Sequence, residues 1–215
     1  MLPDESSVSD HSAEAADAGN PPRKRPKPGE RRVQILQALA QMLEQPGAER
    51  VTTAALAARL QVSEAALYRH FASKAQMFEG LIDFVETSVF GLVNQIGERE
   101  PAGPARAARI VAMVLQFGEK NPGMARVMVG DALVYEHERL QQRMNQLFDK
   151  LEAALRQCLR EGAAENGAAL TPDADAQLSA SVLTAFMVGR LQRFARSGFR
   201  RAPTERLEAC LARML

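Results

Sequence analysis

Several features that mark common classes of protein are scarce in this sequence or missing from it. It has no tryptophan, two tyrosines and two cysteines among 215 residues. Cys158 and Cys210 are isolated, without a cysteine or histidine at metal-ligand spacing, so we expect two reduced thiols with no role in a site. No segment is long and apolar enough to cross a bilayer, and the polar, acidic N-terminus is unlike a signal peptide. We therefore expect a cytoplasmic protein.

Signs of catalysis are missing too. The chain has no glycine-rich phosphate loop and no turn motif around a nucleophilic serine. Its three histidines lie far apart in sequence. His137 stands between two glutamates, but no second histidine or cysteine at ligand spacing accompanies it. We predict that the protein is not an enzyme and holds no cofactor or metal.

The net charge is only +1, but the charges are unevenly distributed. Residues 1–22 carry five acidic and no basic side chains, residues 23–74 carry ten basic and four acidic ones, and residues 75–215 carry seventeen of each. Residues 1–29 also have almost no large apolar side chains, which predicts a disordered tail. Its basic end, Arg23–Pro28, is either an arm along DNA or a solvated linker. The positive charge points to nucleic-acid binding by residues 23–74.

The stretch Val51–Lys74 predicts two short helices joined by a tight turn. Residues 54–60 are rich in alanine, and Ser63 is a natural N-cap for a second helix over residues 64–70. The apolar side chains expected to face inward are Leu56, Leu60, Val62, Leu67 and Phe71. This arrangement is a helix-turn-helix, whose second helix lies in the major groove of DNA.

The first residues of that second helix are expected at base edges, with polar side chains around them at phosphates. Alanine methyl groups can contact a thymine methyl, while hydroxyl and cationic groups can donate to phosphate oxygens. The predicted DNA-binding residues are Thr52, Thr53, Ser63, Glu64, Ala65, Ala66, Tyr68, Arg69, His70 and Lys74. An alanine-rich helix pair with scattered arginines and no DNA-binding role gives a similar pattern, so the pattern alone leaves both interpretations open.

The segment Ala66–Lys74 (ALYRHFASK) resembles the end of the recognition helix and the start of the next helix in TetR-type regulators. Ala72 stands where members of that family usually have proline, while Ser73 and Gln76 keep a capping box for the next helix. The resemblance implies a small DNA-binding domain followed by a helical bundle.

Helical periodicity continues through the rest of the chain. Residues 30–45 predict a first helix with Val33, Leu36, Leu39, Ala40 and Leu43 on one apolar face. Further helices are predicted over residues 74–100, 105–120, 123–130, 135–163, 172–197 and 204–214. Because no strand-like alternation occurs, we predict an all-α protein with a tail (1–29), a helix-turn-helix domain (30–74) and a bundle for dimerisation and partner binding (75–215).

One helix-turn-helix reads only a few base pairs, so we expect a homodimer on double-stranded DNA. Two-fold pairing would place two recognition helices about one DNA turn apart, roughly 34 Å, or a multiple of it. We expect pairing through the C-terminal helices, where Gly189 would allow a close approach. The predicted interface residues are Leu183, Phe186, Met187, Leu191 and Phe194.

A second resemblance lies in the bundle. Phe117–Met124 (FGEKNPGM), and the following charged helix with Asn145–Phe148 (NQLF), are similar to the nucleoid occlusion branch of TetR-type regulators. The resemblance implies binding to palindromic chromosomal sites and, when DNA-bound, to the C-terminal tail of the division protein FtsZ, so that Z-ring assembly is blocked over the nucleoid. The partner residues that it implies are Phe84, Met113, Lys120 and Asn121. Leu92 stands where relatives commonly have a basic residue, which removes one cation from the partner site.

Two functions therefore remain: a DNA-activated inhibitor of division, or a ligand-responsive transcriptional repressor. A ligand-responsive bundle needs an apolar pocket, commonly with aromatic groups. The side chains Phe90, Phe117, Phe148 and Phe186 stand at core spacing and are expected in packing. The low aromatic content therefore favours the first function.

Overall fold

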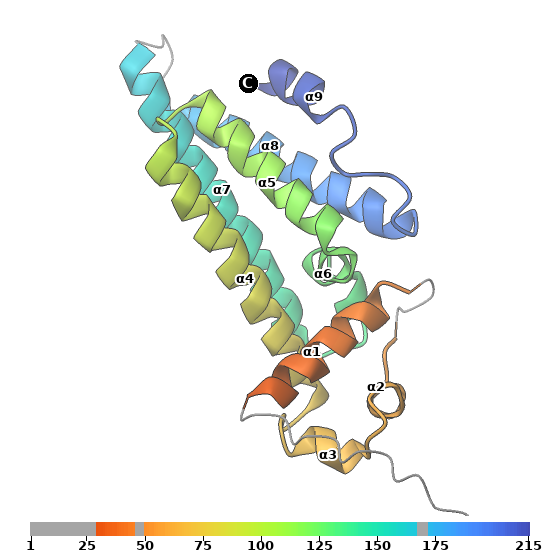
Figure 1. Ribbon diagram of the computed structural model, residues 1–215. Helices are drawn as coiled ribbons and strands as arrows, with labels where there is room; N and C mark the ends of the chain where they lie inside the picture. The colour runs from red at the N-terminus through yellow and green to blue at the C-terminus, as the bar shows by residue number, and fades with distance from the viewer. Residues whose placement is uncertain (1–28, 46–49, 167–171) are drawn as a thin grey trace, which may run out of the picture.

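The computed structural model describes residues 29–45, 50–166 and 172–215, which form helices and the turns between them (Figure 1). The predicted all-α fold is confirmed, since no strand occurs in the described ranges. The predicted tail, up to residue 28, lies outside them. In chain order the elements are α1 (Glu30–Leu43), α2 (Thr53–Arg59), α3 (Glu64–Tyr68), α4 (Lys74–Arg99), α5 (Pro104–Lys120), α6 (Pro122–Met128), the 3-10 turn η1 (Asp131–Leu133), α7 (Glu138–Asn166), α8 (Pro172–Arg196) and α9 (Leu207–Met214).

Local hydrogen bonds explain where the two helices of the helix-turn-helix begin and end. After α2 the N–H of Val62 donates to the carbonyl of Ala57 at 3.0 Å, which is the long bond of a Schellman turn. Gln61 lies in the left-handed region of this turn, with a φ of 54°. Ser63 then begins α3, because its Oγ accepts a hydrogen bond from the N–H of Ala66 at 3.3 Å.

Helix α1 has two apolar sides rather than the one that we predicted. The buried side chains around α1, α2 and α3 include Ile35, Leu39, Leu43, Leu56, Leu67 and Phe71. Leu60 and Val62, also predicted to face inward, are half-buried. Val33 is 53% exposed, and it lies with Leu36 and Ala40 on the side of α1 that faces α4 and α6. The prediction of a single apolar face on α1 is therefore wrong.

The start of α4 departs slightly from the predicted capping box. The Oγ of Ser73 accepts a hydrogen bond from the N–H of Gln76 at 3.1 Å, as predicted. The side-chain oxygen of Gln76, however, accepts from the N–H of Ala72 at 2.6 Å instead of that of Ser73. This bond needs the N–H that alanine provides and that proline at the same position would lack.

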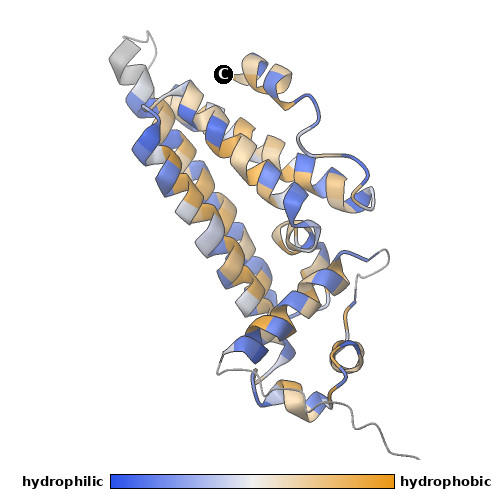
Figure 2. Ribbon diagram, viewed as in Figure 1, coloured by the Kyte–Doolittle hydropathy of each residue, from blue (hydrophilic) through white to orange (hydrophobic). Residues whose placement is uncertain are grey.

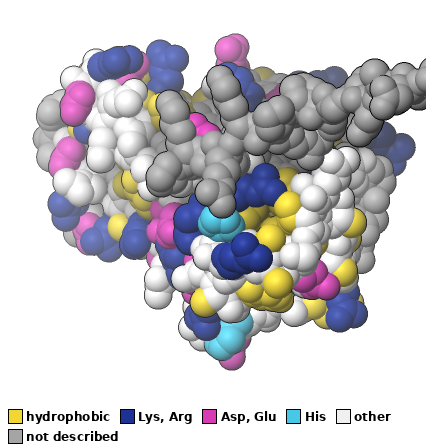
Figure 3. Space-filling model, turned by 60° about the horizontal axis from the view of Figure 1, so that its bottom comes forward, with side chains coloured by type: hydrophobic (Ala, Val, Ile, Leu, Met, Phe, Trp, Pro, Cys, Tyr) yellow, Lys and Arg dark blue, Asp and Glu magenta, His cyan; other side chains and the backbone are white. Residues whose placement is uncertain are grey.

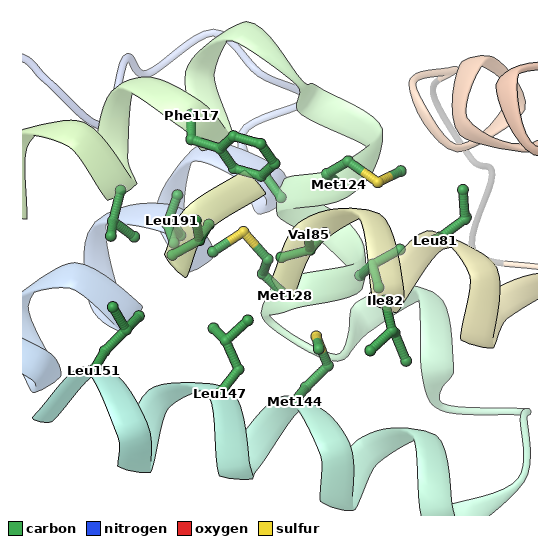
Figure 4. Close-up of a cluster of buried hydrophobic side chains, with 14 of the residues drawn as sticks. Leu81, Ile82, Val85, Phe117, Met124, Met128, Met144, Leu147, Leu151 and Leu191 are labelled. Carbon is green, nitrogen blue, oxygen red and sulfur yellow. The ribbon is translucent and has the colours of Figure 1, made fainter. Parts of the chain in front are cut away.

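Helices α4, α5, α7 and α8 pack along their apolar sides, as the colouring by hydropathy shows (Figure 2). Val85 of α4, Met128 of α6, Leu147 of α7 and Leu191 of α8 gather in the interior (Figure 4). All four are almost completely buried. Side chains of the protein itself therefore fill the centre of the bundle at this level.

Four of the five side chains predicted at the dimer interface lie inside the protomer. The exposed fraction is 0% for Leu183, Met187 and Leu191 and 3% for Phe194. Phe186, the fifth, is half-buried and packs against the same core. A second copy cannot reach the four buried side chains, so their assignment to the interface is wrong.

The outward side of α8 carries a different apolar stripe. Leu178 is 67% exposed and Val182 is 47% exposed. Ala185 follows as an exposed small residue, and a Cβ added at Gly189 would meet no atom within 4 Å. These positions recur at helical spacing, so they form one continuous face. We call Leu178, Val182, Ala185 and Gly189 the α8 stripe.

Helix α6 joins the DNA-binding domain to the bundle. A Cβ added at Gly123 would lie 2.3 Å from the carbonyl oxygen of Ala40, so only glycine allows α6 to approach α1 this closely. Arg126, 8% exposed, donates to the carbonyl of Gln45 just after α1 at 3.2 Å. Its guanidinium also lies 4.9 Å from the ring centroid of Phe199, which follows α8. Helix α1 and the segment after it are thus in direct contact with the bundle.

Ion pairs hold α4 against α7. Arg139 donates to Glu79 at 2.8 Å, and Arg143 donates to both Asp83 at 2.9 Å and Glu86 at 2.5 Å. Burial alone would lower the pKa of Arg143, but the hydrogen bonds that it donates to Glu86 and Asp83 outweigh burial and raise the pKa above its ordinary value. These three carboxylates are therefore already occupied by cations of the bundle.

The cysteines agree with the expectation of reduced thiols, since both are free in the described part of the chain. Cys158 is buried, and its Sγ donates to the carbonyl of Gly103 at 3.3 Å. Burial raises the pKa of this thiol, so it stays protonated at neutral pH. Within the described ranges no helix has the length and apolarity of a membrane span.

Candidate nucleic-acid interface and partner groove

The predicted DNA-binding residues gather on one side of the molecule, around α3. Tyr68 is 45% exposed, and Thr52, Ser63, Ala65 and Arg69 are exposed as well. Seen from this side, basic side chains and a histidine stand beside apolar and uncharged ones (Figure 3). We call the exposed residues around α3, together with Arg32 and Lys74, the DNA face.

The hydroxyl groups of Thr52 and Thr53, both at the start of α2, make different hydrogen bonds. Thr52 accepts a hydrogen bond from the N–H of Ala55 at 3.1 Å, which leaves its own proton available for a phosphate oxygen. Thr53 instead donates its proton to Glu64 at 2.6 Å. That bond links the start of α2 to the start of α3 and holds the carboxylate of Glu64. Thr53 therefore positions the recognition helix and is not free to donate to phosphate.

Arg32 is a residue of the DNA face that the sequence pattern did not reveal. It lies in the first turn of α1, donates to the carbonyl of His70 at the end of the recognition helix, and stacks 4.1 Å from the ring centroid of Phe71. The bond satisfies a carbonyl that the short helix leaves unpaired. The only signal in the sequence was its place four positions after the end of the basic segment Arg23–Pro28.

Lys74, predicted to contact phosphate, forms an ion pair with Glu136, which lies just before α7. The lysine side chain is 25% exposed and that of Glu136 is 9% exposed. A DNA phosphate that binds Lys74 would therefore have to compete with the carboxylate of Glu136. The pairing could not be read from the sequence, because 62 positions separate the two residues.

This pairing leads to a testable prediction. Glu136→Gln should strengthen binding to all DNA sequences alike, by about two- to fivefold, because the partly buried ion pair with Lys74 no longer competes with phosphate. The slope of log K against log salt should become steeper by up to about one. Fluorescence anisotropy with unrelated duplexes over a salt series measures both effects.

A matched control is Glu138→Gln, which removes the same charge two positions away. Glu138 accepts from the side chain of Gln142 at 3.2 Å and does not contact Lys74. An equal gain in both variants would mean that net charge, not the release of Lys74, causes the effect.

Two hollows along α4 contain predicted partner residues. The first has a volume of about 520 Å³ and lies between α1, α4 and α6, with Phe84 and Asn121 at one side. The second has a volume of about 360 Å³ and contains Leu92 and Met113. Phe84 and Leu92 are eight positions apart on α4, and Met113 and Asn121 are eight apart at the α5 side. The hollows are thus about 12 Å apart, given 1.5 Å per helical residue. We call them together the α4–α5 groove.

Three of the four predicted partner residues line the hollows, Phe84 and Asn121 in the first and Met113 in the second, and Lys120 directly precedes Asn121. Phe84 is 50% exposed, with its ring centroid 6.1 Å from that of Phe117. Lys120 is exposed at the end of α5 and pairs with no carboxylate among the described residues. Asn121 donates its side-chain amide to the carbonyl of Phe117 at 2.8 Å, which caps α5. Asn121 therefore shapes the groove and keeps its oxygen free as an acceptor.

The groove also contains residues that the resemblance did not supply. Val33 and Leu36 of α1 line the first hollow, so the DNA-binding domain forms one of its walls. Arg99 and Arg109 line the second hollow beside Leu92. Arg109 pairs with Glu100 at 3.1 Å, whereas Arg99 is exposed. Cations therefore remain next to the position where relatives commonly have a basic residue.

Metal binding finds no support in the described ranges, where no group of three or more His, Cys, Asp and Glu side chains comes together. His137 is exposed, and its Nδ1 accepts from the N–H of Arg139 at 3.2 Å. It thus helps to begin α7.

Comparisons with known proteins agree with the sequence resemblances. Residues 35–81 match the model of bacterial regulatory proteins of the tetR family, and residues 104–214 match an SlmA-like model described as a tetracyclin repressor-like C-terminal domain. The nucleoid occlusion factor SlmA of Cronobacter sakazakii is 51% identical over 180 residues, which cover 83% of this chain and 90% of that protein. The SlmA of Salmonella paratyphi B is 50% identical over the same shares.

Solved structures of low sequence identity share the fold. A TetR-family transcriptional regulator from Bordetella parapertussis superposes with a TM-score of 0.67 at 16% identity, covering 87% of this chain and 95% of that one. The regulator PfmR from Thermus thermophilus gives 0.66 at 19% identity, covering 85% and 94%. From the two family models and the relatives about half identical, the chain belongs to the TetR family of bacterial regulatory proteins, in the group with an SlmA-like C-terminal domain.

Proposed function

We propose that this protein is a nucleoid occlusion factor. It binds palindromic chromosomal sites as a homodimer and, when bound to DNA, binds the C-terminal tail of FtsZ and blocks assembly of the Z-ring over the nucleoid. Support comes from relatives about half identical over most of the chain that carry this name. The observation that carries the proposal is the α4–α5 groove, which has a wall from the DNA-binding domain.

The groove fits an extended peptide with apolar and acidic side chains. Two hollows about 12 Å apart correspond to about four residues of extended chain. Phe84 and Leu92 offer apolar surface, while Lys120 and Arg99 place cations near the two ends. The C-terminal tail of FtsZ has this mixed apolar and acidic character, and cations at a rim favour it.

The position of the first hollow gives a physical reason for dependence on DNA. Its walls belong to α1 on one side and to α4 and α6 on the other. When DNA binds α3, it restricts the DNA-binding domain and with it α1. A partner that prefers this orientation of α1 then binds more tightly, and by linkage it also stabilises the DNA complex.

The α8 stripe is the surface proposed for the dimer. It is apolar, exposed and continuous, and Gly189 at its end leaves room for a helix to approach. An apolar stripe of this kind on a regulator that reads palindromic DNA fits a second copy of the chain, because a two-fold interface brings the same patch from both protomers together.

The bundle interior supports the adaptor over the ligand-responsive repressor. At the level of α6 the space between α4, α5, α7 and α8 is occupied by Val85, Met128, Leu147, Leu191 and their neighbours (Figure 4). A hollow of about 440 Å³ between α4, α5 and α7, lined by Val93, Ile110 and Cys158 among others, also opens at the surface. A repressor that senses a small apolar molecule needs an apolar cavity inside the bundle to bind it. The hollows described above instead open at the surface.

Sedimentation of FtsZ polymers tests the function. The DNA is a duplex that the protein selects from a random-sequence pool. We expect the protein with this duplex to lower the amount of pelleted FtsZ strongly, whereas protein alone or duplex alone has little effect. A protein that binds its duplex, leaves FtsZ unaffected and releases DNA on addition of a small molecule would be a repressor instead.

A further inference from the structure

We propose that residues 1–22, the acidic segment, act as an intramolecular competitor of DNA. In protein without DNA, their carboxylates bind the basic side chains of the DNA face. The proposal concerns a segment outside the described residues, and it depends on three observations: the state of the basic residues on the face, the point where the chain enters the fold, and the charges of the segment itself.

The first observation is that the basic residues of the DNA face have no anionic partner in their own domain. Arg31 donates to the uncharged side chain of Gln34 at 2.9 Å, and Arg32 donates to a backbone carbonyl. Arg69 is exposed. In the described part of the chain none of the three pairs with a carboxylate, whereas Arg139 and Arg143 of the bundle do. Arg32 and Arg69 of the face, and Arg31 at its border, therefore keep their positive charge available to an anion, whereas Lys74 is already paired with Glu136.

The second observation is the place where the chain enters the fold. The described chain begins at Gly29, immediately before α1, and Arg32 in the first turn of α1 contacts the end of the recognition helix through His70. Only residues 23–28 separate the acidic segment from this point. Six residues span at most about 20 Å when extended. The segment is therefore tethered at the edge of the DNA face, where its effective concentration is about millimolar.

The third observation is the chemistry of the segment. It contains five carboxylates and no basic side chain, and these are Asp4, Glu5, Asp10, Glu14 and Asp17. Carboxylates compete with phosphates for the same guanidinium groups. Unlike DNA, the acidic segment presents no base sequence to the protein. Such a competitor weakens binding to every DNA sequence by the same factor. Because exposed charges are screened, the effect fades as salt is raised.

The experiments distinguish the DNA face from two other places that carry basic side chains. Residues 193–201 include Arg193, Arg196, Arg200 and Arg201, all exposed, on the bundle near the end of α8. The basic segment Arg23–Pro28 could also pair with the acidic one. The acidic segment is tethered beside the recognition helix, which favours the DNA face over the end of α8. The free arginines of the face bind carboxylates of this segment in addition to those that pair with the basic segment.

The first experiment removes the charge and keeps the length. In the full chain all five acidic residues are replaced by their amides, as Asp→Asn and Glu→Gln. Affinity for a random-sequence duplex should rise about tenfold at about 50 mM salt, which is the effect of a few exposed ion pairs. The gain should fall below about twofold at about 200 mM.

The control exchanges each Asp for Glu and each Glu for Asp, which keeps the charge and should leave binding unchanged. Equal affinity of the amide variant and the wild type at low salt would overturn the proposal, and so would a gain that persists at high salt. The inference depends on DNA binding alone and not on FtsZ, so a failure of the FtsZ experiment leaves it standing. Wild-type protein that binds no DNA would overturn both.

The second experiment locates the contact. A spin label is attached to the full chain through Ala16→Cys, with Cys210→Ser to remove the half-buried thiol. Amide signals of residues 31–32 and 63–74 should broaden, and they should recover on addition of duplex DNA. Broadening of residues 193–201 alone, of residues 23–28 alone, or of no described residue would overturn the assignment to the DNA face.

Discussion

Replacing Leu178 with glutamate is expected to separate the dimer into monomers and to weaken binding to a palindromic site by about a hundredfold or more. The side chain is 67% exposed in the protomer, so the substitution costs little in the folded monomer. In a dimer through the α8 stripe two carboxylates would be buried against each other, which costs several kcal/mol. Losing the second recognition helix then removes the gain from binding two half-sites at once.

Analytical ultracentrifugation at low micromolar concentration measures the first effect, and anisotropy with the selected duplex measures the second. Gln177→Glu is the matched control, because it adds the same charge one position away on the side that faces α7. There Gln177 donates to Glu152 at 2.9 Å and accepts from Arg156 at 3.1 Å. This control should remain a dimer. A Leu178→Glu protein that stays dimeric would place the interface elsewhere.

The assignment of the dimer interface shows what periodicity cannot decide. Helix α8 has an apolar stripe at Leu183, Met187 and Leu191 and another that includes Leu178 and Val182. Both recur at helical spacing, and the spacing does not say which stripe faces the protomer's own core. The larger side chains are natural choices for an interface, but they fill the core because a bundle needs volume there. Helix α1 shows the same ambiguity at Val33.

The helix-turn-helix was predictable because its determinants are local. Ser63 and Ser73 cap helices within three residues of themselves, and the buried Leu67 and Phe71 follow the helical period. The left-handed Gln61 carried no such signal, since glycine is the usual residue there. The turn forms because its backbone hydrogen bonds satisfy the end of α2.

The groove and the pairing of Lys74 lay beyond sequence reasoning because they join distant parts of the chain. The first hollow is built by α1, α4 and α6. Arg99 and Arg109 meet Leu92 and Met113 only because α4 and α5 lie side by side. The resemblance supplied Phe84 and Lys120 as partner residues without their surroundings. The structure adds the wall from α1 and the remaining cations.

Phe84→Ala and Lys120→Glu are each expected to abolish inhibition of FtsZ assembly while affinity for the selected duplex stays near that of the wild type. Phe84 supplies the exposed aromatic surface of the first hollow, and Lys120 is an exposed cation at the end of α5, next to Asn121 of the same hollow. Neither belongs to the DNA face. Sedimentation of FtsZ with protein and duplex measures the loss, and anisotropy with a labelled FtsZ tail peptide measures binding directly.

The stability of Phe84→Ala separates a partner residue from a core residue. Half of the side chain is already in water, so truncation should lower the free energy of unfolding by only about 1–2 kcal/mol. A fully buried phenylalanine would cost about 3–5 kcal/mol. Lys150→Glu, an equal charge reversal at an exposed position of α7, is the control for Lys120→Glu and should leave FtsZ inhibition intact. If Phe84→Ala inhibits FtsZ as well as the wild type does, the tail does not bind in the α4–α5 groove. If it loses inhibition together with DNA binding and several kcal/mol of stability, Phe84 holds the fold together, and the partner site must then be sought on other residues.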